Sequence, residues 1–488
     1  MIKRGAGVIC NISSLPSDYG IGDFGKGGRA FVDLLADMEM GWWQILPLCP
    51  VGSGNSPYSS DSAFATNSLY ADPEDLVERG LLTKAEADAA RYPGTPYSVD
   101  YAFAAETKEK LLRQAYARAV VSDYPDKVQK YVLENESWLP GYMSYMAAKT
   151  ANGGKPCYQW TKEGDPAEAR YCAFKQYILE QQWLSLKKYA NDKGVSLLGD
   201  MPIYVSHDSA DFYTHKDLFL TGPDGRLTKV AGVPPDYFSA DGQFWGNPLY
   251  DWDKMAADGY RWWTQRIGRS LRLYDAVRID HFRGFHRFWA VPAGAATARE
   301  GSWEDGPGMA LFQAVEKAYP NPAIIAEDLG TVDEGLVAFL KETGYPGMKV
   351  LQFGFTSPDS DHVPYKYTPN HIAYTGTHDN DTMLGWLWAI PMEEKLRLLE
   401  YCRCADGDWR EGGPHSQVIH AIITTLWESA AALAILPVQD MCGFGTDTRM
   451  NIPGKAESNW RYRLTPEAMK SIDRNFFRKI NRVYGRVR

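Results

Sequence analysis

Short runs of apolar residues recur along the whole chain, and each run ends in polar residues, glycine or proline. Runs of this length with these boundaries are typical of strands that are buried on both faces. The pattern predicts eight such strands, at 7–13, 42–48, 196–203, 276–282, 323–329, 348–353, 372–379 and 432–440.

Between most of these runs, apolar residues recur at helical spacing. This spacing predicts helices at 24–40, 174–194, 260–275 and 332–344. Gly194 is expected to end the second of them, and Thr331 is expected to cap the start of the last. Eight strands that alternate with helices favour an α/β fold of the (β/α)8 TIM barrel type, with a doubly wound sheet as the competing arrangement.

Two connections are too long for simple loops between a strand and a helix. We expect the whole chain, 1–488, to be a single barrel with one insertion at 50–172 after the second strand, helical at about 74–150. A further insertion at 204–257, after the third strand, is rich in glycine, proline, aspartate and tyrosine, which predicts a long structured loop. No separate C-terminal β-domain is expected.

Composition narrows the class of ligand. The net charge is −9 and no long block of lysine and arginine occurs, which argues against a nucleic-acid partner. The chain has 16 Trp, 29 Tyr and 19 Phe, and many of them lie in loop-like stretches. Most of these rings are expected in the core, but aromatic loops also favour ligands with apolar faces and polar rims, as sugars have.

The seven cysteines are irregularly spaced and include no C-x-x-C pair, so neither a disulfide framework nor a zinc site is predicted. The N-terminus lacks the apolar stretch of a signal peptide, and no apolar run is long enough to span a membrane. We therefore expect a soluble, cytoplasmic protein with free thiols and no membrane partner.

Carboxylates follow several of the predicted strands. Asp280, Glu327 and Asp379 each end a strand, and Asp200 lies near the end of another. Any one of them could simply cap a loop or a helix, but four at equivalent positions favour a shared site, because catalytic groups of a barrel lie at the C-terminal ends of its strands.

Paired carboxylates suggest cleavage of a glycosidic bond, in which one ionised carboxylate attacks and one protonated carboxyl donates a proton. Arg278 and Asp280 are two residues apart and so share one face of a strand, where the arginine would keep the aspartate ionised. Glu327 has no cation beside it and an apolar flank, which would raise its pKa. Several aromatic residues follow this strand, at positions 282, 285, 288 and 289.

Histidines raise the alternative of a catalytic metal. His207, His281, His286 and His378 form neither an H-x-H nor an H-E-x-x-H pattern, so no metal is predicted. His378 is better interpreted as a hydrogen-bond donor to substrate hydroxyls. The chain also lacks the G-x-S-x-G pattern of serine hydrolases.

Several long motifs resemble one family. They are RIDHFRG, AEDLG and TGTHDND around the carboxylates, GVICNISSLPSDYGIGDFG at 7–25, GNSPYSSDSAFATNSLY at 54–70, LLGDMPIYVSHDSADFY at 197–213, AGVPPDYFSADGQFWGNPLYDW at 231–252 and MNIPG at 450–454. In this order, over the whole chain, they resemble the 4-α-glucanotransferases, also called amylomaltases or disproportionating enzymes, of the α-amylase superfamily.

The resemblance implies a role for each carboxylate. Asp280 would be the nucleophile, Glu327 the acid/base and Asp379 the stabiliser of the transition state. The other residues that it places around the donor sugar are Tyr58, Asp200, Arg278, His378 and, with a less defined role, Asn451. The family needs no cofactor, and no metal is implied.

The resemblance also places the loop at 232–248 over the acceptor sugar. Prolines restrict the backbone of this loop and glycines permit tight turns in it. The loop carries the candidate substrate-binding residues Asp236, Tyr237, Phe238, Gln243 and Trp245. The implied reaction is retaining transfer of α-1,4-glucan segments between maltooligosaccharides. A hydrolase with the same carboxylates is the first alternative, and a non-catalytic glucan-binding protein is the second.

Overall fold

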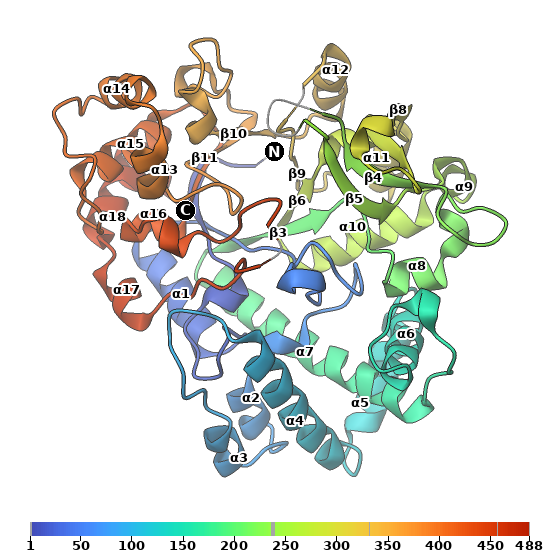
Figure 1. Cartoon of the computed structure of the whole chain (residues 1–488). Coiled ribbons are helices and arrows are strands. Elements are labelled where there is room, and N and C mark those ends of the chain that lie inside the picture. Colours follow the sequence, from blue (N-terminus) through green and yellow to red (C-terminus); the bar gives the residue numbers. More distant parts are fainter. Residues whose placement is uncertain (1, 236–239, 331, 456, 488) are drawn as a thin grey trace.

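Eight parallel strands form a closed barrel in the computed structural model, which describes residues 2–235, 240–330, 332–455 and 457–487 (Figure 1). Their order is β10-β11-β12-β1-β2-β3-β6-β9, and Ala326 N donates to Pro346 O at 2.9 Å where β9 meets β10. The bounds are β1 (Gly5–Ile9), β2 (Trp42–Gln44), β3 (Ser196–Pro202), β6 (Ala276–Asp280), β9 (Ile324–Ala326), β10 (Gly347–Val350), β11 (His371–Tyr374) and β12 (Leu433–Pro437). The TIM barrel is confirmed, and each predicted apolar run supplies one strand.

The helices predicted between the strands are present. They are α1 (Lys26–Asp37), α7 (Pro166–Asp192), α10 (Arg261–Leu273) and α12 (Glu334–Thr343). Gly194 follows α7 with φ +75°, a conformation that suits glycine. Thr331 lies outside the described residues, and Asp333 caps α12 instead, because its Oδ1 accepts a hydrogen bond from Leu336 N at 2.8 Å.

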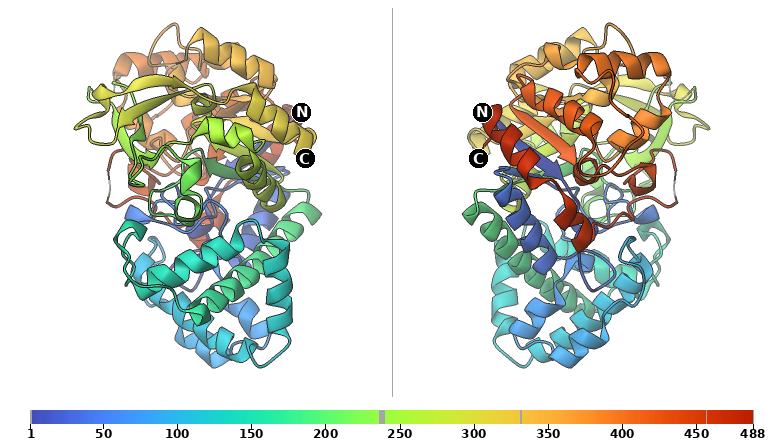
Figure 2. Two further views of the ribbon diagram at one scale, coloured as in Figure 1. Left: turned by 90° about the vertical axis from the view of Figure 1, so that its right-hand side faces the viewer. Right: turned by 90° about the vertical axis from the view of Figure 1, so that its left-hand side faces the viewer.

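A helical lobe follows β2 and packs along α7 (Figure 2). It consists of α2 (Pro73–Glu78), α3 (Lys84–Ala89), α4 (Tyr101–Ala119), α5 (Tyr124–Glu134) and α6 (Leu139–Ala151). Lys108 on α4 is buried against the barrel side, where its Nζ donates to Ala71 O at 2.5 Å and to Asp23 Oδ2 at 3.3 Å. This buried ammonium fixes the lobe to the first loops of the barrel.

The sequence analysis missed a second sheet. Four antiparallel strands in the order β5-β4-β7-β8 lie beside the barrel: β4 (Lys229–Val233), β5 (Gln243–Pro248), β7 (Arg287–Pro292) and β8 (Ser302–Asp305). Two of them lie within 204–257, which was predicted as a loop. These strands are short, and β4 pairs with β7 more than 50 residues further along the chain. The local pattern of apolar and polar residues therefore does not predict them.

The aromatic residues that follow β6 lie where the barrel meets the second sheet. Phe282, Phe285 and Phe288 are buried, and the first two pack against each other at 5.4 Å between ring centroids. Trp289 on β7 packs edge-on against Trp303 on β8 at 5.3 Å. These rings are therefore core between the barrel and the second sheet rather than a surface for a ligand.

Near the N-terminus, three glycines have a spacing that is also found in doubly wound, nucleotide-binding folds. Gly20, Gly22 and Gly25 have the G-x-G-x-x-G spacing of dinucleotide-binding turns. Here glycine is needed for close packing of the backbone, because a Cβ on Gly22 would lie 1.9 Å from the carbonyl oxygen of Ile12. The closed barrel shows that the pattern does not mark a doubly wound sheet.

The remaining helices complete the barrel and its C-terminal side. They are α8 (Ala210–Thr214), α9 (Trp252–Ala257), α11 (Met309–Ala318), α13 (Met383–Ala389), α14 (Met392–Tyr401), α15 (Gln417–Glu428), α16 (Val438–Cys442), α17 (Pro466–Ser471) and α18 (Arg474–Val483). Within the described ranges no helix is both long and apolar enough to cross a bilayer. All seven cysteines are unpaired.

Arg486 closes the end of the barrel where the strands begin. Its guanidinium is fully buried and donates to five carbonyl oxygens, including Gly5 O at 2.9 Å and Ala432 O at 3.2 Å at the starts of β1 and β12. The other three acceptors follow or end α15: Trp427, Ser429 and Ala431. One side chain near the C-terminus therefore joins the first strand, the last strand and a covering helix.

Arg4 also donates to Trp427 O, Ser429 O and Ala431 O, so the loss of Arg486 falls mainly on Gly5 O and Ala432 O. We expect Arg486→Ala to lower the free energy of unfolding by about 3 kcal/mol, because a buried carbonyl group that loses a partner costs about 1–3 kcal/mol. Urea unfolding measures the change. Arg482→Ala is the matched control: Arg482 is exposed and pairs with Glu39 at the surface, so its loss should cost less than about 1 kcal/mol. Equal losses in the two variants would contradict this role of Arg486.

Candidate active site

The predicted carboxylates gather at the C-terminal mouth of the barrel. Asp280 is the last residue of β6, and Glu327 directly follows β9. Asp200 lies within β3 rather than at its end, and Asp379 lies five residues beyond β11, which ends at Tyr374 rather than at 379 as predicted. The loop after β11 therefore delivers Asp379, because the chain leaves the strand ladder before it reaches this residue.

Arg278 joins two of the carboxylates. The parallel register of β3 and β6 pairs Asp200 with Arg278. Arg278 Nη1 donates to both oxygens of Asp200, at 2.7 and 2.8 Å, while Nη2 donates to Asp280 Oδ1 at 2.8 Å. Arg278 is only 4% exposed. This single buried cation therefore pairs with the buried Asp200 and also holds Asp280 at the mouth of the barrel.

Aromatic rings form one wall above these ion pairs. Tyr58 donates its hydroxyl hydrogen to Asp200 Oδ2 at 2.7 Å. Its ring stacks on His378, with centroids 5.2 Å apart and an interplanar angle of 16°. Trp460 lies 5.9 Å from each of these rings. The three rings, which come from widely separated parts of the chain, form a platform beside Asp280.

Glu327 has a different environment from Asp280. Its carboxyl group accepts hydrogen bonds from the backbone N–H groups of His281, at 2.7 Å, and Leu329, at 2.8 Å. Burial, and secondarily the negative charge of Asp280, raise the pKa of Glu327 to about 8, although Arg278 and the two N–H groups oppose the shift. Glu327 is therefore mostly protonated at neutral pH.

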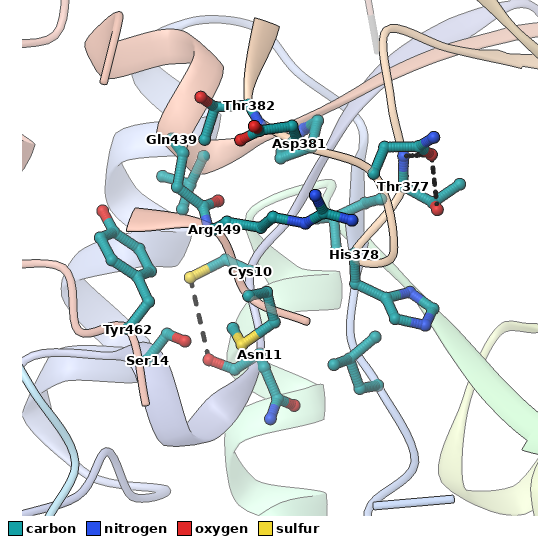
Figure 3. Close-up of a pocket in the computed structure, with 16 residues that line it drawn as sticks. Cys10, Asn11, Ser14, Thr377, His378, Asp381, Thr382, Gln439, Arg449 and Tyr462 are labelled. Carbon is teal, nitrogen blue, oxygen red and sulfur yellow. Dashed lines mark hydrogen bonds between the residues drawn. The ribbon is translucent and has the colours of Figure 1, made fainter. Parts of the chain in front are cut away.

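Asp379 is held by a late segment of the chain. Asn451 Nδ2 donates to Asp379 Oδ1 at 2.6 Å, and Arg449 Nη2 donates to the carbonyl oxygen of Asp379 at 2.6 Å. Arg449 Nε also donates to Asn451 O at 2.8 Å. Arg449 and His378 line a small pocket that adjoins the cleft (Figure 3). Arg449 thus fixes the backbone of both partners in the Asp379–Asn451 contact.

A cleft of about 570 Å³ opens over this site. Asp280 and Asp379 line it, together with Tyr58, His378, Asn451, Trp460, Tyr204, His207, Phe244 and Trp245. The rings of Tyr58, His378 and Trp460 contact one another, and the ring of Tyr204 contacts that of Trp245. Glu327 is 9% exposed and does not contribute to the lining. The volume is in the range of small-ligand sites.

Two of the predicted acceptor-loop residues are described. Trp245 on β5 is 38% exposed, and its ring meets the edge of His281 at 4.9 Å. Trp245 Nε1 donates to Gln243 Oε1 at 3.1 Å. The other three predicted residues of this loop, Asp236, Tyr237 and Phe238, lie outside the described residues.

Three residues that the sequence patterns did not indicate as site residues also line the cleft, His281, Tyr204 and Trp460, and a fourth, Arg449, lies in the adjoining pocket. His281 and Trp460 have positive φ, +51° and +65°, which is unfavourable for bulky residues and is often found at functional sites. Burial lowers the pKa of His281 to about 4, so its ring stays neutral. The position of His281 beside Asp280 in RIDHFRG could have signalled it, whereas nothing local marks Trp460.

Metal ligation was examined at the same positions. In the part of the chain that the structure describes, no group of three or more histidines, cysteines or carboxylates is arranged to hold a metal ion. His286 lies near Asp333 and stacks on Phe339 at 5.8 Å, away from the cleft that His207, His281 and His378 line.

The chain is similar to known proteins over its full length. A family model described as 4-alpha-glucanotransferase matches residues 10–469. A 4-alpha-glucanotransferase of Streptococcus pneumoniae is 40% identical over 508 residues, which cover 100% of this chain and 98% of the relative. One from Thermus thermophilus is 38% identical and covers 95% of both chains.

Solved structures agree with the sequence relatives. An amylomaltase from Streptococcus agalactiae in complex with acarbose matches with a TM-score of 0.93 and 36% identity over 100% of both chains. An amylomaltase from Corynebacterium glutamicum matches with a TM-score of 0.80 at 19% identity, over 99% of this chain and 75% of that one. The second likeness supports the fold alone.

We expect the carboxyl group of Glu327 to titrate near pH 8 because of its burial and the nearby charge of Asp280. Infrared difference spectra of the wild type, with Glu327→Gln as the reference, should show a protonated carboxyl band that disappears as the pH rises through about 8. Asp280→Asn removes the negative charge that favours the protonated form, so the titration should move to lower pH. An unchanged midpoint would show that the two groups do not interact.

Proposed function

This chain belongs to the 4-alpha-glucanotransferase family, and on that premise we propose that Asp280, Glu327 and Asp379 together perform a retaining transfer of α-1,4-glucan segments. The protein is an enzyme of glucan transfer. What we propose beyond the family is the assignment of each chemical role to a residue of this chain. The observation that supports it is the difference between two neighbouring carboxyl groups. Asp280 contacts the buried guanidinium of Arg278, whereas burial raises the pKa of Glu327.

In the first half-reaction, Asp280 attacks the anomeric carbon of the donor. Arg278 occupies Asp280 Oδ1, which leaves Oδ2 for the attack. Glu327 gives its proton to the glycosidic oxygen, the bond to the leaving glucan breaks, and a covalent glycosyl-aspartate forms. A pKa of about 8 keeps this proton available at neutral pH.

In the second half-reaction, the same groups act in reverse. Glu327, now ionised, removes the proton from the 4-hydroxyl of the acceptor, and that oxygen attacks the anomeric carbon and releases Asp280. Asp379 is partly exposed and is oriented by Asn451 at 2.6 Å. We assign it to hydrogen bonds with donor hydroxyl groups that strengthen in the transition state.

The donor sugar occupies the side of the cleft formed by the aromatic platform. The Tyr58 ring would stack on the apolar face of the sugar, while His378 and Asn451 reach its hydroxyl groups. Asp200 is fully engaged by Arg278 and Tyr58, so its contribution is to orient these two residues. No step needs a cofactor, and the partners are α-1,4-glucans and maltooligosaccharides.

The acceptor sugar occupies the opposite side, next to Trp245 and His281. An acceptor competes with water because the cleft orients it, and orientation can be worth effective molarities on the order of 10⁵ M. Gln243 holds the Trp245 indole, and we propose that Asp236, Tyr237 and Phe238 of the same loop complete this subsite. We also propose a cytoplasmic location, in which the seven unpaired cysteines would stay reduced.

Trapping of the intermediate tests the assignment of nucleophile and acid. Glu327→Gln should lose nearly all turnover of maltotriose but should still form the intermediate from a glucosyl fluoride, because fluoride leaves without a proton. Mass spectrometry of the digested variant should find the label on the peptide that contains Asp280. Asp280→Asn should give no label with either donor. A label on Glu327 or Asp379 would overturn the mechanism.

We expect Trp245→Ala to raise the ratio of hydrolysis to transfer from maltotriose by several-fold to about tenfold, because an acceptor held less firmly competes less well with water. Chromatography of free glucose and longer maltodextrins at fixed conversion measures this ratio. Trp388→Ala is the control, since Trp388 is also exposed but does not line the cleft. An unchanged ratio in Trp245→Ala would remove Trp245 from the acceptor site.

A further inference from the structure

Tyr158 is an exposed aromatic residue beside the acceptor side of the cleft. It lies on a short 3-10 turn, Cys157–Gln159, between α6 and α7, and it is 61% exposed. Its ring stacks on His207, with centroids 4.8 Å apart and an interplanar angle of 21°. Because His207 lines the cleft, Tyr158 lies next to the cleft, on the outer side of the His207 ring.

The turn that carries Tyr158 is held to this wall. Cys157 N donates to Asp208 Oδ1 at 2.8 Å. Asp208 also accepts hydrogen bonds from Tyr145 Oη at 2.8 Å and from Lys149 Nζ at 3.0 Å, both on α6. Lys149 Nζ further donates to Asp61 Oδ1 at 2.7 Å. The helical lobe is thereby tied to the two loops that carry the cleft residues Tyr58 and His207, at Asp61 and Asp208 respectively.

The residue after the turn is fixed as well. Trp160 Nε1 donates to Lys155 O at 2.7 Å, and the Trp160 ring packs at 5.1 Å against both Tyr145 and Tyr213. An exposed ring on a backbone held at both sides loses little conformational freedom when a ligand binds. Tyr365 differs: its side chain is 69% exposed, and it stacks on no other ring in the part of the chain that the structure describes.

The position of Tyr158 relative to Asp280 indicates which sugars it could meet. The proposed donor side of the cleft is formed by the mutually contacting rings of Tyr58, His378 and Trp460. His207 also lines the cleft, and its loop is joined to β5, the strand of Trp245, because Asn247 Nδ2 donates to Val205 O at 2.9 Å. In Figure 1, α6 and α8 lie on the same side of the barrel as β5, across from α13 and α16. A glucan that extends from the acceptor sugar past His207 would therefore reach Tyr158.

We propose that Tyr158, stacked on His207, forms a binding platform for the glucose units of a long acceptor beyond the first acceptor sugar. This inference rests on the proposed glucan transfer. The free part of the Tyr158 ring offers an apolar surface to one face of a glucose unit. Burial lowers the pKa of His207, so the neutral imidazole has both a donor and an acceptor nitrogen for sugar hydroxyl groups.

The test compares acceptors of different length with the full-length enzyme. With glucosyl fluoride as donor, the acceptor KM is measured for glucose and for maltotetraose from the yield of transfer products. In Tyr158→Ala, the ratio of the maltotetraose KM to the glucose KM should rise about fivefold or more, and in Tyr158→Phe it should stay within twofold of the wild type. Tyr365→Ala is the control for loss of an exposed tyrosine.

An unchanged ratio in Tyr158→Ala would overturn the proposal, and so would an equal rise of both KM values, which would indicate a structural role of the ring. Failure of the proposed function has a different signature. In that case Asp280→Asn would still transfer glucose to both acceptors, whatever residue 158 is.

Discussion

The site depends on one buried guanidinium. Taking an ion out of water costs several kcal/mol even after the protein relaxes, and the cost is offset only when partners with good geometry are at hand. Arg278 has two such partners, Asp200 with both oxygens and Asp280 with one. Asp280 at the mouth is thus oriented by a guanidinium whose other partner, Asp200, lies deeper in the barrel.

Burial also determines the protonation of Glu327. It receives two backbone N–H groups but no direct cation, so the loss of water and the charge of Asp280 favour its protonated form. The raised pKa of Glu327 therefore comes first from its burial and second from the charge of Asp280, and Arg278, which contacts Asp280 directly, only partly opposes it.

Parts of the molecule outside the barrel build the walls of the cleft. The second sheet supplies Phe244 and Trp245 on β5, and the late segment around Asn451 and Trp460 supplies the opposite wall. The helical lobe contributes indirectly, through Lys149 and its contacts with Asp61 and Asp208. The strands and the residues directly after them position Arg278, Asp280 and Glu327, while the loop after β11, the second sheet and the late segment complete the lining of the cleft.

The sequence by itself determined the barrel and the short-range part of the site. Buried strands appear as apolar runs, and the two-residue period of a strand places Arg278 and Asp280 on one face, so both could be predicted locally. The individual roles came from the family motifs. Only the tertiary structure decided that Asp200 shares Arg278 and that Tyr58 stacks on His378, because these contacts join residues 78 and 320 positions apart, and their register exists only once the barrel closes. The second sheet escaped prediction for the same reason, since its strands are stabilised by partners distant in the chain rather than by their own pattern.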